Sequence, residues 1–235
     1  MNLEHSFFIS EQNISGERFV LDKTESIHAI RVLRLKINEE LFLFDGLGTA
    51  YKAKIDNLSY NKVEGAIIAK LKGHGENEYS IHLGIGLIRR GKFENLIEKC
   101  TELGVNSFHP LLLDHNIKQT SNTNRCKKII VASSKQCHRS TIPLIYEPKS
   151  LKSLFSLAKM KFIAASMEAK KKLSDVKLKG NRPVMLLIGP EGDFSSNEIE
   201  LLKEKEVELF NLGNRRLRSE TAAIAAVAIL NYKFS

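Results

Sequence analysis

Hydrophobic and polar residues alternate along several stretches of the first 72 residues, which is the pattern of half-buried β-strands. The stretches with this alternation are His5–Ile9, Leu41–Asp45, Thr49–Asn57 and Lys62–Leu71. Between the first two of them, Glu25–Leu33 has the spacing of a short helix, and Thr24 is placed to cap it. Together with a turn at Asp45-Gly46-Leu47-Gly48, these patterns predict a small barrel-like module over residues 1–72.

The polar segment 73–78 separates this module from a region where strand-like and helix-like patterns alternate. The expected strands are Ile81–Ile88, Phe108–Leu113, Lys161–Ser166, Val184–Ile188 and Glu208–Leu212. The expected helices are Lys92–Leu103, Asn124–Gln136, Ser195–Lys205 (with a capping box, Ser195 and Glu198) and Glu220–Tyr232. Val184–Ile188 is entirely apolar, as in a central parallel strand. The alternation predicts an α/β domain over residues 73–235, with a mostly parallel sheet covered on both faces.

The charge of the chain is concentrated in its middle. The 235 residues have a formal net charge of +9, but residues 1–72 carry 10 basic and 10 acidic side chains. Residues 115–182 carry 16 basic and 3 acidic side chains, a net charge of +13. Such a local imbalance favours a polyanion such as a nucleic acid as the partner. The alternative is that these lysines only keep a helical surface soluble.

Several classes of protein are disfavoured. No apolar run approaches the roughly 20 residues that a membrane-spanning helix needs, and the first residues do not form a secretory signal, so we expect a cytoplasmic protein. The three cysteines, Cys100, Cys126 and Cys137, contain no pair at CxxC spacing. Histidine and cysteine show no spacing typical of metal ligands. We therefore expect reduced thiols and no metal.

One glycine pattern resembles a phosphate-binding loop. The segment Gly86-Leu87-Ile88-Arg89-Arg90-Gly91-Lys92-Phe93 matches GxxxxGK between a strand and a helix. That motif requires Ser or Thr after the lysine to bind magnesium, and Phe93 cannot do so. Leu87 and Ile88 also have the character of buried strand residues. Nucleotide hydrolysis is therefore disfavoured.

Two turns near the C-terminus carry the strongest functional signal. Gly189-Pro190-Glu191-Gly192 follows an apolar strand, and ligands in open α/β sheets bind at the carboxyl ends of strands. The next strand is followed by Gly213-Asn214-Arg215-Arg216-Leu217-Arg218-Ser219-Glu220-Thr221-Ala222. A basic loop with Ser219 as a helix cap would explain part of this segment. It would not explain Leu212 and Leu217, which flank a glycine in a loop that should be polar.

Together these turns resemble the RsmE family of SPOUT methyltransferases, which use S-adenosylmethionine to methylate N3 of a uridine in 16S ribosomal RNA. Gly189–Gly192 matches the family's GPEGG turn, with Asp193 in place of the last glycine, and Leu212–Ala222 matches its LGxRxLRxETA segment. Further matches are His5–Phe8, Val32–Leu35, Phe44–Gly46 and Lys99–Val105. Lys135-Gln136-Cys137-His138-Arg139 stands where the family often has Glu-Gln-Ser-Gly-Arg.

The resemblance implies a PUA-like RNA-binding barrel in residues 1–72 and a SPOUT domain with a trefoil knot in residues 73–235. It also implies a homodimer that acts on 16S ribosomal RNA in the small subunit, with the cofactor held in the knot. The cofactor contacts that it implies are Ala165, Ser166, Met167, Ile188, Gly189, Glu191, Gly192, Leu212, Gly213 and Leu217. The residues that we expect to contact RNA are Arg31, Arg34, Lys127, Lys128 and Arg139.

Uridine N3 carries a proton at neutral pH, so the enzyme must align N3 with the methyl group and assist deprotonation or stabilise the anion. Arg218 and Glu220 are the catalytic candidates. We expect Arg218 to stabilise the anion and Glu220 to orient Arg218, because a carboxylate beside an arginine is a weaker base. Alternatively, the two residues form a salt bridge that caps the last helix. Two other functions also stay open: a SPOUT enzyme for a ribose 2′-hydroxyl or another base, and a non-catalytic RNA-binding protein.

Overall fold

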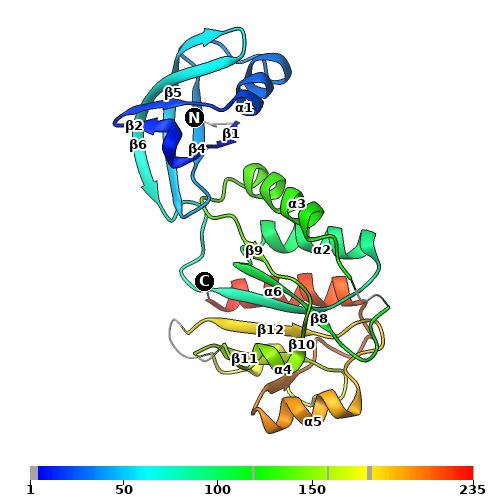
Figure 1. Cartoon of the computed structure of the whole chain (residues 1–235). Coiled ribbons are helices and arrows are strands. Elements are labelled where there is room, and N and C mark those ends of the chain that lie inside the picture. Colours follow the sequence, from blue (N-terminus) through cyan, green and yellow to red (C-terminus); the bar gives the residue numbers. More distant parts are fainter. Residues whose placement is uncertain (1–4, 118–119, 158, 179–181, 235) are drawn as a thin grey trace. The chain divides into compact units, whose positions relative to one another are not determined.

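The computed structural model describes residues 5–117, 120–157, 159–178 and 182–234, which form two compact units (Figure 1). The first unit ends at Glu76 and also includes Ser134–Ile142. The second unit comprises Asn77–Ser133 and the residues from Pro143 onward. We expected two continuous domains, 1–72 and 73–235. The structure differs because the chain returns to the first unit for the short segment 134–142.

The first unit is built on one curled sheet. Its strands are β1 (Ser6–Phe8), β2 (Ile14–Ser15), β3 (Arg18–Val20), β4 (Glu40–Phe44), β5 (Thr49–Ser59) and β6 (Lys62–Lys72). Their order is β1-β4-β5-β6-β3-β2, and only the pair β1 and β4 is parallel. Alternate residues such as Leu41 and Leu43 lie in the buried core, as the sequence pattern indicated. Strands β2 and β3 were missed because they are too short to show alternation.

The short helix of this unit begins earlier than we expected. Helix α1 (Lys23–Ile27) continues into one π-helical turn, η2 (His28–Val32), and a 3₁₀ turn, η1 (Glu11–Asn13), precedes both. The side chain of Asp22 accepts a hydrogen bond of 2.8 Å from the backbone N–H of Glu25. Asp22 is therefore the cap, and Thr24 lies inside the helix, so the expected role of Thr24 was wrong.

The segment 134–142 is fixed in the first unit by buried charge pairs. Arg139 is only 1% exposed, and its Nη2 lies 2.7 Å from Oε2 of Glu76. The other oxygen of Glu76 accepts a hydrogen bond of 2.9 Å from the backbone N–H of Thr141, and Lys135 pairs with Glu25. A buried, paired guanidinium cannot meet a phosphate, so we no longer assign Arg139 to RNA contact. Its position makes it part of the framework of the first unit.

The second unit contains an all-parallel sheet. Its strands are β7 (Ile81–Gly86), β8 (Ser107–Leu112), β9 (Leu144–Ile145), β10 (Lys149–Ser150), β11 (Lys161–Ala165), β12 (Val184–Ile188) and β13 (Glu208–Phe210). The order is β10-β8-β7-β12-β11-β13, with β9 paired to β8. Every residue of β12 is buried, because the strand has neighbours on both sides and helices over both faces. The predicted central strand is thus confirmed.

Helices cover both faces of this sheet (Figure 1). They are α2 (Arg90–Glu102), α4 (Leu151–Leu154), α5 (Ser196–Glu204) and α6 (Ser219–Phe234), with a 3₁₀ turn, η3 (Leu173–Asp175), while α3 (Thr123–Gln136) runs from the second unit into the segment that belongs to the first. Helices α2 and α6 pack together on one face, and α4 and α5 lie on the other with Met185 and Leu187 of β12. The capping box of Ser195 and Glu198 is present as predicted. In the described residues, no helix is long and apolar enough to cross a membrane.

Candidate active site

Three loops of the second unit meet at one edge of its sheet. Strand β11 lies between β12 and β13, and all three are parallel. Ala164 pairs with Leu187, and Ala165 pairs with Phe210, so the three strands end at the same level. The segments that follow Ala165, Ile188 and Phe210 therefore converge, although they are far apart in the sequence. A crevice at the carboxyl ends of parallel strands is where such sheets bind ligands.

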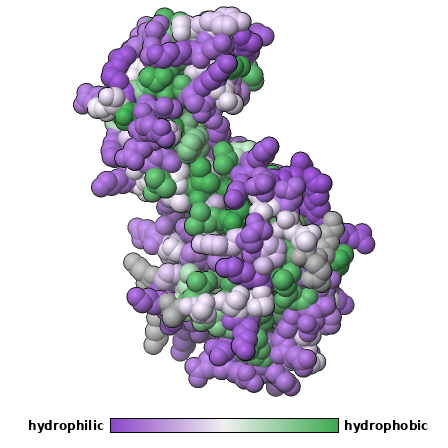
Figure 2. Space-filling view, in the orientation of Figure 1, coloured by the Kyte–Doolittle hydropathy of each residue, from purple (hydrophilic) through white to green (hydrophobic). Residues whose placement is uncertain are grey.

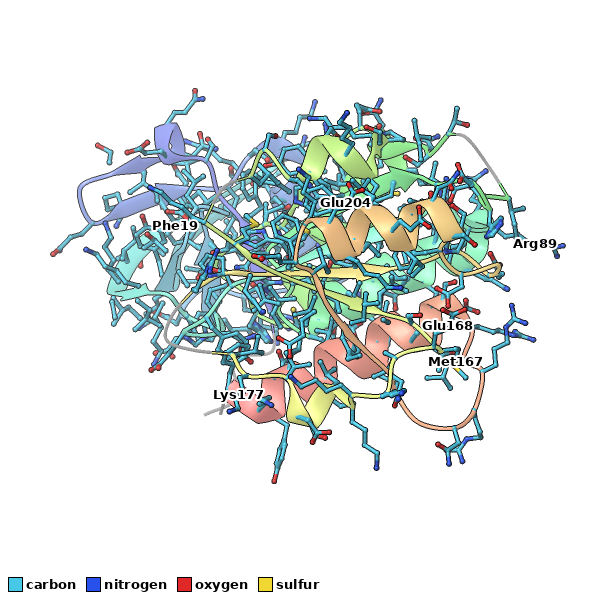
Figure 3. The ribbon with its side chains drawn as sticks, turned by 90° about the horizontal axis from the view of Figure 1, so that it is seen from below. Phe19, Arg89, Met167, Glu168, Lys177 and Glu204 are labelled. Atoms are coloured by element: carbon cyan, nitrogen blue, oxygen red, sulfur yellow. The ribbon has the colours of Figure 1, made fainter. Side chains whose placement is uncertain are left out.

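These loops border a pocket that is open to solvent, and the space between them, including its open mouth, is about 520 Å³. Its lining residues are Ala165, Ser166, Met167, Ile188, Gly189, Pro190, Glu191, Asp193, Asn211, Leu212, Arg215, Arg216, Leu217, Ser219 and Ala222. Eight of the ten residues that we expected to contact the cofactor are among them; Gly192 and Gly213 are not. Figure 3 shows Met167 beside the start of α6, which closes the pocket on that side. The structure thus brings the two predicted turns together, with β11 supplying the third wall.

The two glycines outside the lining have conformational and packing roles. A side chain on Gly192 would approach Cβ of His115 to 2.8 Å, which leaves no room for it. Gly213 has a φ of +115°, a backbone conformation that L-residues rarely adopt, and a Cβ there would meet no protein atom within 4 Å. Asp193, at the last glycine position of the family's GPEGG turn, has a φ of +63°. The turn therefore keeps a left-handed residue at this place although the glycine is gone.

Asn211 fixes two walls of the pocket to each other. Its side-chain amide donates a hydrogen bond of 2.5 Å to the carbonyl of Ala169, and its Oδ1 accepts one of 3.2 Å from the N–H of Gly213. Because the backbone N–H of Ser166 also bonds to the carbonyl of Phe210 at 2.9 Å, the segment after β11 is tied to the segment after β13. The apolar lining therefore sits on a rigid backbone, which favours specific binding of a ligand.

A charged cluster lies next to the pocket. Nζ of Lys92 is 3.1 Å from Oε1 of Glu191 and 3.9 Å from Oε1 of Glu220. Arg216 donates a hydrogen bond of 3.0 Å from Nη2 to the carbonyl of Glu191. Arg218 is exposed, and within the described residues it forms no ion pair with Glu220. The expectation that Glu220 orients or pairs with Arg218 is therefore wrong, because Glu220 faces Lys92 on the neighbouring helix.

Lys92 is the functional candidate that the sequence analysis missed. It was considered only as part of the rejected GxxxxGK pattern, and Leu87 and Ile88 are indeed buried rather than arranged around a phosphate. A usable signal was present, because Lys92 is in the first turn of the helix that follows β7. Since β7 pairs with β12, that turn lies next to the loop that carries Glu191.

Two of the three cysteines, Cys100 and Cys126, are poor candidates for a nucleophile. Cys100 is fully buried, which raises the pKa of its thiol far above the usual value, and burial raises the pKa of Cys126 to about 11. A thiol that stays protonated is a poor nucleophile. No group of three or more His, Cys, Asp and Glu residues in the described chain could hold a metal ion.

The remaining RNA candidates are accessible. Arg31, Arg34, Lys127 and Lys128 are exposed, and the guanidinium of Arg31 lies 5.3 Å from the ring centroid of Tyr60. Most of the surface visible in Figure 2 is hydrophilic. Exposed basic side chains on such a surface are available to phosphates, whereas the buried Arg139 is not.

Comparison with known proteins agrees with this architecture. An RNA methyltransferase PUA domain matches residues 21–68, and an RNA methyltransferase domain matches residues 75–231.

Ribosomal RNA small subunit methyltransferase E of Buchnera aphidicola subsp. Schizaphis graminum is 32% identical over 91% of this chain and 90% of its own length. The corresponding Neisseria gonorrhoeae protein, solved bound to S-adenosyl methionine, has 25% identity, a TM-score of 0.88 and 97% coverage of both chains. A Legionella pneumophila methyltransferase solved with the same cofactor has 28% identity, a TM-score of 0.84 and 97% coverage of both chains. The chain therefore belongs to the ribosomal RNA small subunit methyltransferase E (RsmE) family of RNA methyltransferases.

Proposed function

We propose that the protein methylates N3 of a uridine in 16S ribosomal RNA of the assembled small subunit, with S-adenosylmethionine as the methyl donor. The observation that carries this proposal is the pocket between the turns Gly189–Gly192 and Leu212–Leu217, in a chain whose relatives are named as small-subunit methyltransferases. Two relatives were solved with S-adenosylmethionine, which supports the choice of cofactor.

The pocket fits an adenosine-containing cofactor. Ile188, Leu212 and Leu217 provide an apolar slot for a flat ring, while the glycine-bearing turns let backbone groups approach its edge. The cofactor supplies an electrophilic methyl group on a sulfonium and requires no metal. Ala165, Ser166 and Met167 complete the wall on the side of β11. We assign these residues, with Gly189 and Glu191, to holding and orienting the donor.

The site must also activate the substrate for methyl transfer. The N3 proton of uridine must leave, and the negative charge then spreads onto O2 and O4. A fixed cation at the mouth of the pocket stabilises that charge as it develops. Arg218 lies between Leu217 and Ser219, which both line the pocket, and its side chain is free of an ion pair with Glu220 within the described chain. We assign the stabilisation of the anion to Arg218 and place Glu220 in the same catalytic site.

Three further properties are part of the proposal: a trefoil knot that holds the cofactor, a homodimer, and action in the cytoplasm. The alanines of α6 give no support for the dimer, because Ala223 and Ala226 are buried within the chain itself. The exposed side chains of α6 include Ile229 and Tyr232, which are 37% and 87% exposed. These apolar groups are available for a second copy of the chain.

RNA binding should depend strongly on salt. Residues 115–182 carry a net charge of +13, and each phosphate contact lowers the slope of log affinity against log salt by about 0.7–0.9. Replacing Lys127 and Lys128 with glutamate should weaken binding and flatten that slope. The measurement is RNA binding across a salt series. The matched control is the same double reversal at Lys203 and Lys205, which are exposed on or beside α5. Equal slopes for the two double variants would contradict the assignment.

The function itself is tested in cells. Small-subunit RNA from cells that lack the protein should have lost 3-methyluridine, and a plasmid copy should restore it. Loss of a 2′-O-methylated nucleoside instead would point to the ribose. Unchanged nucleosides would exclude a methyltransferase role on this RNA.

A further inference from the structure

The charged cluster beside the pocket joins three separate elements. Lys92 belongs to the first turn of α2, Glu191 to the turn after β12, and Glu220 to the first turn of α6. The contact with Glu191 is close, at 3.1 Å, and the contact with Glu220 is looser, at 3.9 Å. One ammonium group therefore contacts two carboxylates, and these three side chains together have a formal net charge of −1.

Each carboxylate of this cluster has an oxygen that lacks a partner. Oε2 of Glu191 and Oε2 of Glu220 are buried, and neither has a hydrogen-bond donor among the described residues. A buried acceptor without a donor costs free energy, so such atoms in a native fold indicate a ligand or a functional role. Glu191 lines the pocket, and Ser219 next to Glu220 does so too. The unsatisfied oxygens therefore lie at the edge of the place where cofactor and substrate would meet.

The Watson–Crick edge of uracil complements such a cluster. It presents an N3–H donor between two carbonyl acceptors, O2 and O4. A carboxylate beside an ammonium group offers an acceptor next to a donor. We propose that Glu220 accepts the N3 proton of the target uridine and that Lys92 is the positioning residue that holds the carboxylate of Glu220 in place for this transfer. This inference rests on the proposed function and extends it to a residue outside the two C-terminal turns.

The proton transfer is balanced within the cluster. The N3–H bond breaks, its electron pair stays on N3, and an O–H bond forms on Oε2 of Glu220. The uracil anion is then available for methylation, with its charge stabilised by Arg218, and Glu220 later returns its proton to solvent. Glu191 suits this role less, because its other oxygen is held at 3.1 Å by Lys92 and its carbonyl is held by Arg216.

Other charged groups near the cluster come from neighbouring loops. Arg216 reaches the backbone of Glu191 from the loop before α6, and Asp193 lies in the same turn as Glu191. Nδ1 of His115, from the segment after β8, lies 3.1 Å from the carbonyl oxygens of Gly192 and Asp193. Lys92 is thus the cation that directly contacts both carboxylates in the described site. Without it, the two carboxylates would lose the cation that they share and would repel each other.

The test uses Lys92→Met and Lys92→Arg, with Lys99→Met as the matched control. Lys99 is on the same helix and also pairs with two glutamates, Glu98 at 2.7 Å and Glu102 at 3.0 Å, but it is not part of the cluster. Single-turnover methylation of purified small subunits is measured over a range of subunit concentrations, which gives the maximal rate and the half-saturating concentration. Cofactor affinity by calorimetry and the melting temperature of each variant are measured in parallel.

Lys92→Met should lower the maximal single-turnover rate about tenfold and leave the half-saturating subunit concentration nearly unchanged, because Glu220 loses the contact that positions it while RNA binding stays intact. Lys92→Arg should restore the rate. Lys99→Met should keep the wild-type rate even where it lowers stability, and cofactor affinity should change little in all three variants. A Lys92→Met enzyme with the wild-type rate, slowed only by its folded fraction, would overturn this inference alone. A wild-type enzyme that forms no 3-methyluridine would overturn the proposed function and this inference together.

Discussion

Replacing Arg218 with alanine is expected to lower the rate of methyl transfer about 100-fold, which is the usual loss for one donor to a developing anion. The uracil anion places charge on O2 and O4, and a guanidinium next to the pocket offsets that charge as it develops. The cofactor already carries a positive sulfonium, so the arginine is better explained by the substrate than by the donor. Single-turnover assays on small subunits measure the effect directly.

The structure separates this role from a structural one. A salt bridge between Arg218 and Glu220 would have made the rate follow stability, but Glu220 contacts Lys92 and the side chain of Arg218 is exposed. Arg218→Ala should therefore leave the melting temperature and the cofactor affinity nearly unchanged, and Arg218→Lys should recover part of the rate. If the melting temperature fell and the rate decreased only because less of the enzyme was folded, the catalytic assignment would be wrong.

Replacing Gly213 with valine is expected to abolish cofactor binding. The backbone at Gly213 has a φ of +115°, which a β-branched residue tolerates poorly, and the strain would fall on the loop that carries Leu212 and Leu217. The added side chain also stands where the backbone should come close to the cofactor. Calorimetric titration with S-adenosylmethionine gives the affinity, and near-ultraviolet circular dichroism shows whether the variant is folded.

The control for Gly213→Val is Gly16→Val. Gly16 also has a positive φ, +58°, and a Cβ there would meet nothing within 4 Å, but it lies between β2 and β3 of the first unit. Both variants carry the backbone strain of a side chain at positive φ, and only Gly213→Val should lose the cofactor. Normal binding by folded Gly213→Val would remove the loop from the cofactor site.

The central sheet and the two turns that line the pocket could be predicted from the sequence because their signals are local. Val184–Ile188 is apolar throughout, and each turn follows its strand directly. The place of Lys92 could not be predicted in this way, because it depends on β7 lying beside β12 and not on any neighbour in the sequence. The same holds for Arg139, whose partner Glu76 lies far away along the chain. The charge of Arg139 suggested contact with a polyanion. The side chain is buried and paired with Glu76, so it stabilises the fold instead.

Two departures from the family pattern show how far a motif can predict backbone shape. Asp193 and His138 stand where the family has glycine, and both have positive φ, +63° and +57°. The chain keeps the left-handed conformation at these places and tolerates its cost in a non-glycine residue. At Asp193 the side chain contributes in return, because its Oδ1 accepts a hydrogen bond of 2.8 Å from the N–H of Phe194. The motif therefore predicted the turn correctly even where its residue changed.

The most direct test of the proposed function is methylation, by the purified protein, of small subunits from cells that lack it. The subunits are incubated with S-adenosylmethionine carrying a labelled methyl group, and the RNA is digested to nucleosides for mass spectrometry. The label should appear in 3-methyluridine, at one position of 16S ribosomal RNA. Label in a 2′-O-methylated nucleoside, in another base, or in none would contradict it.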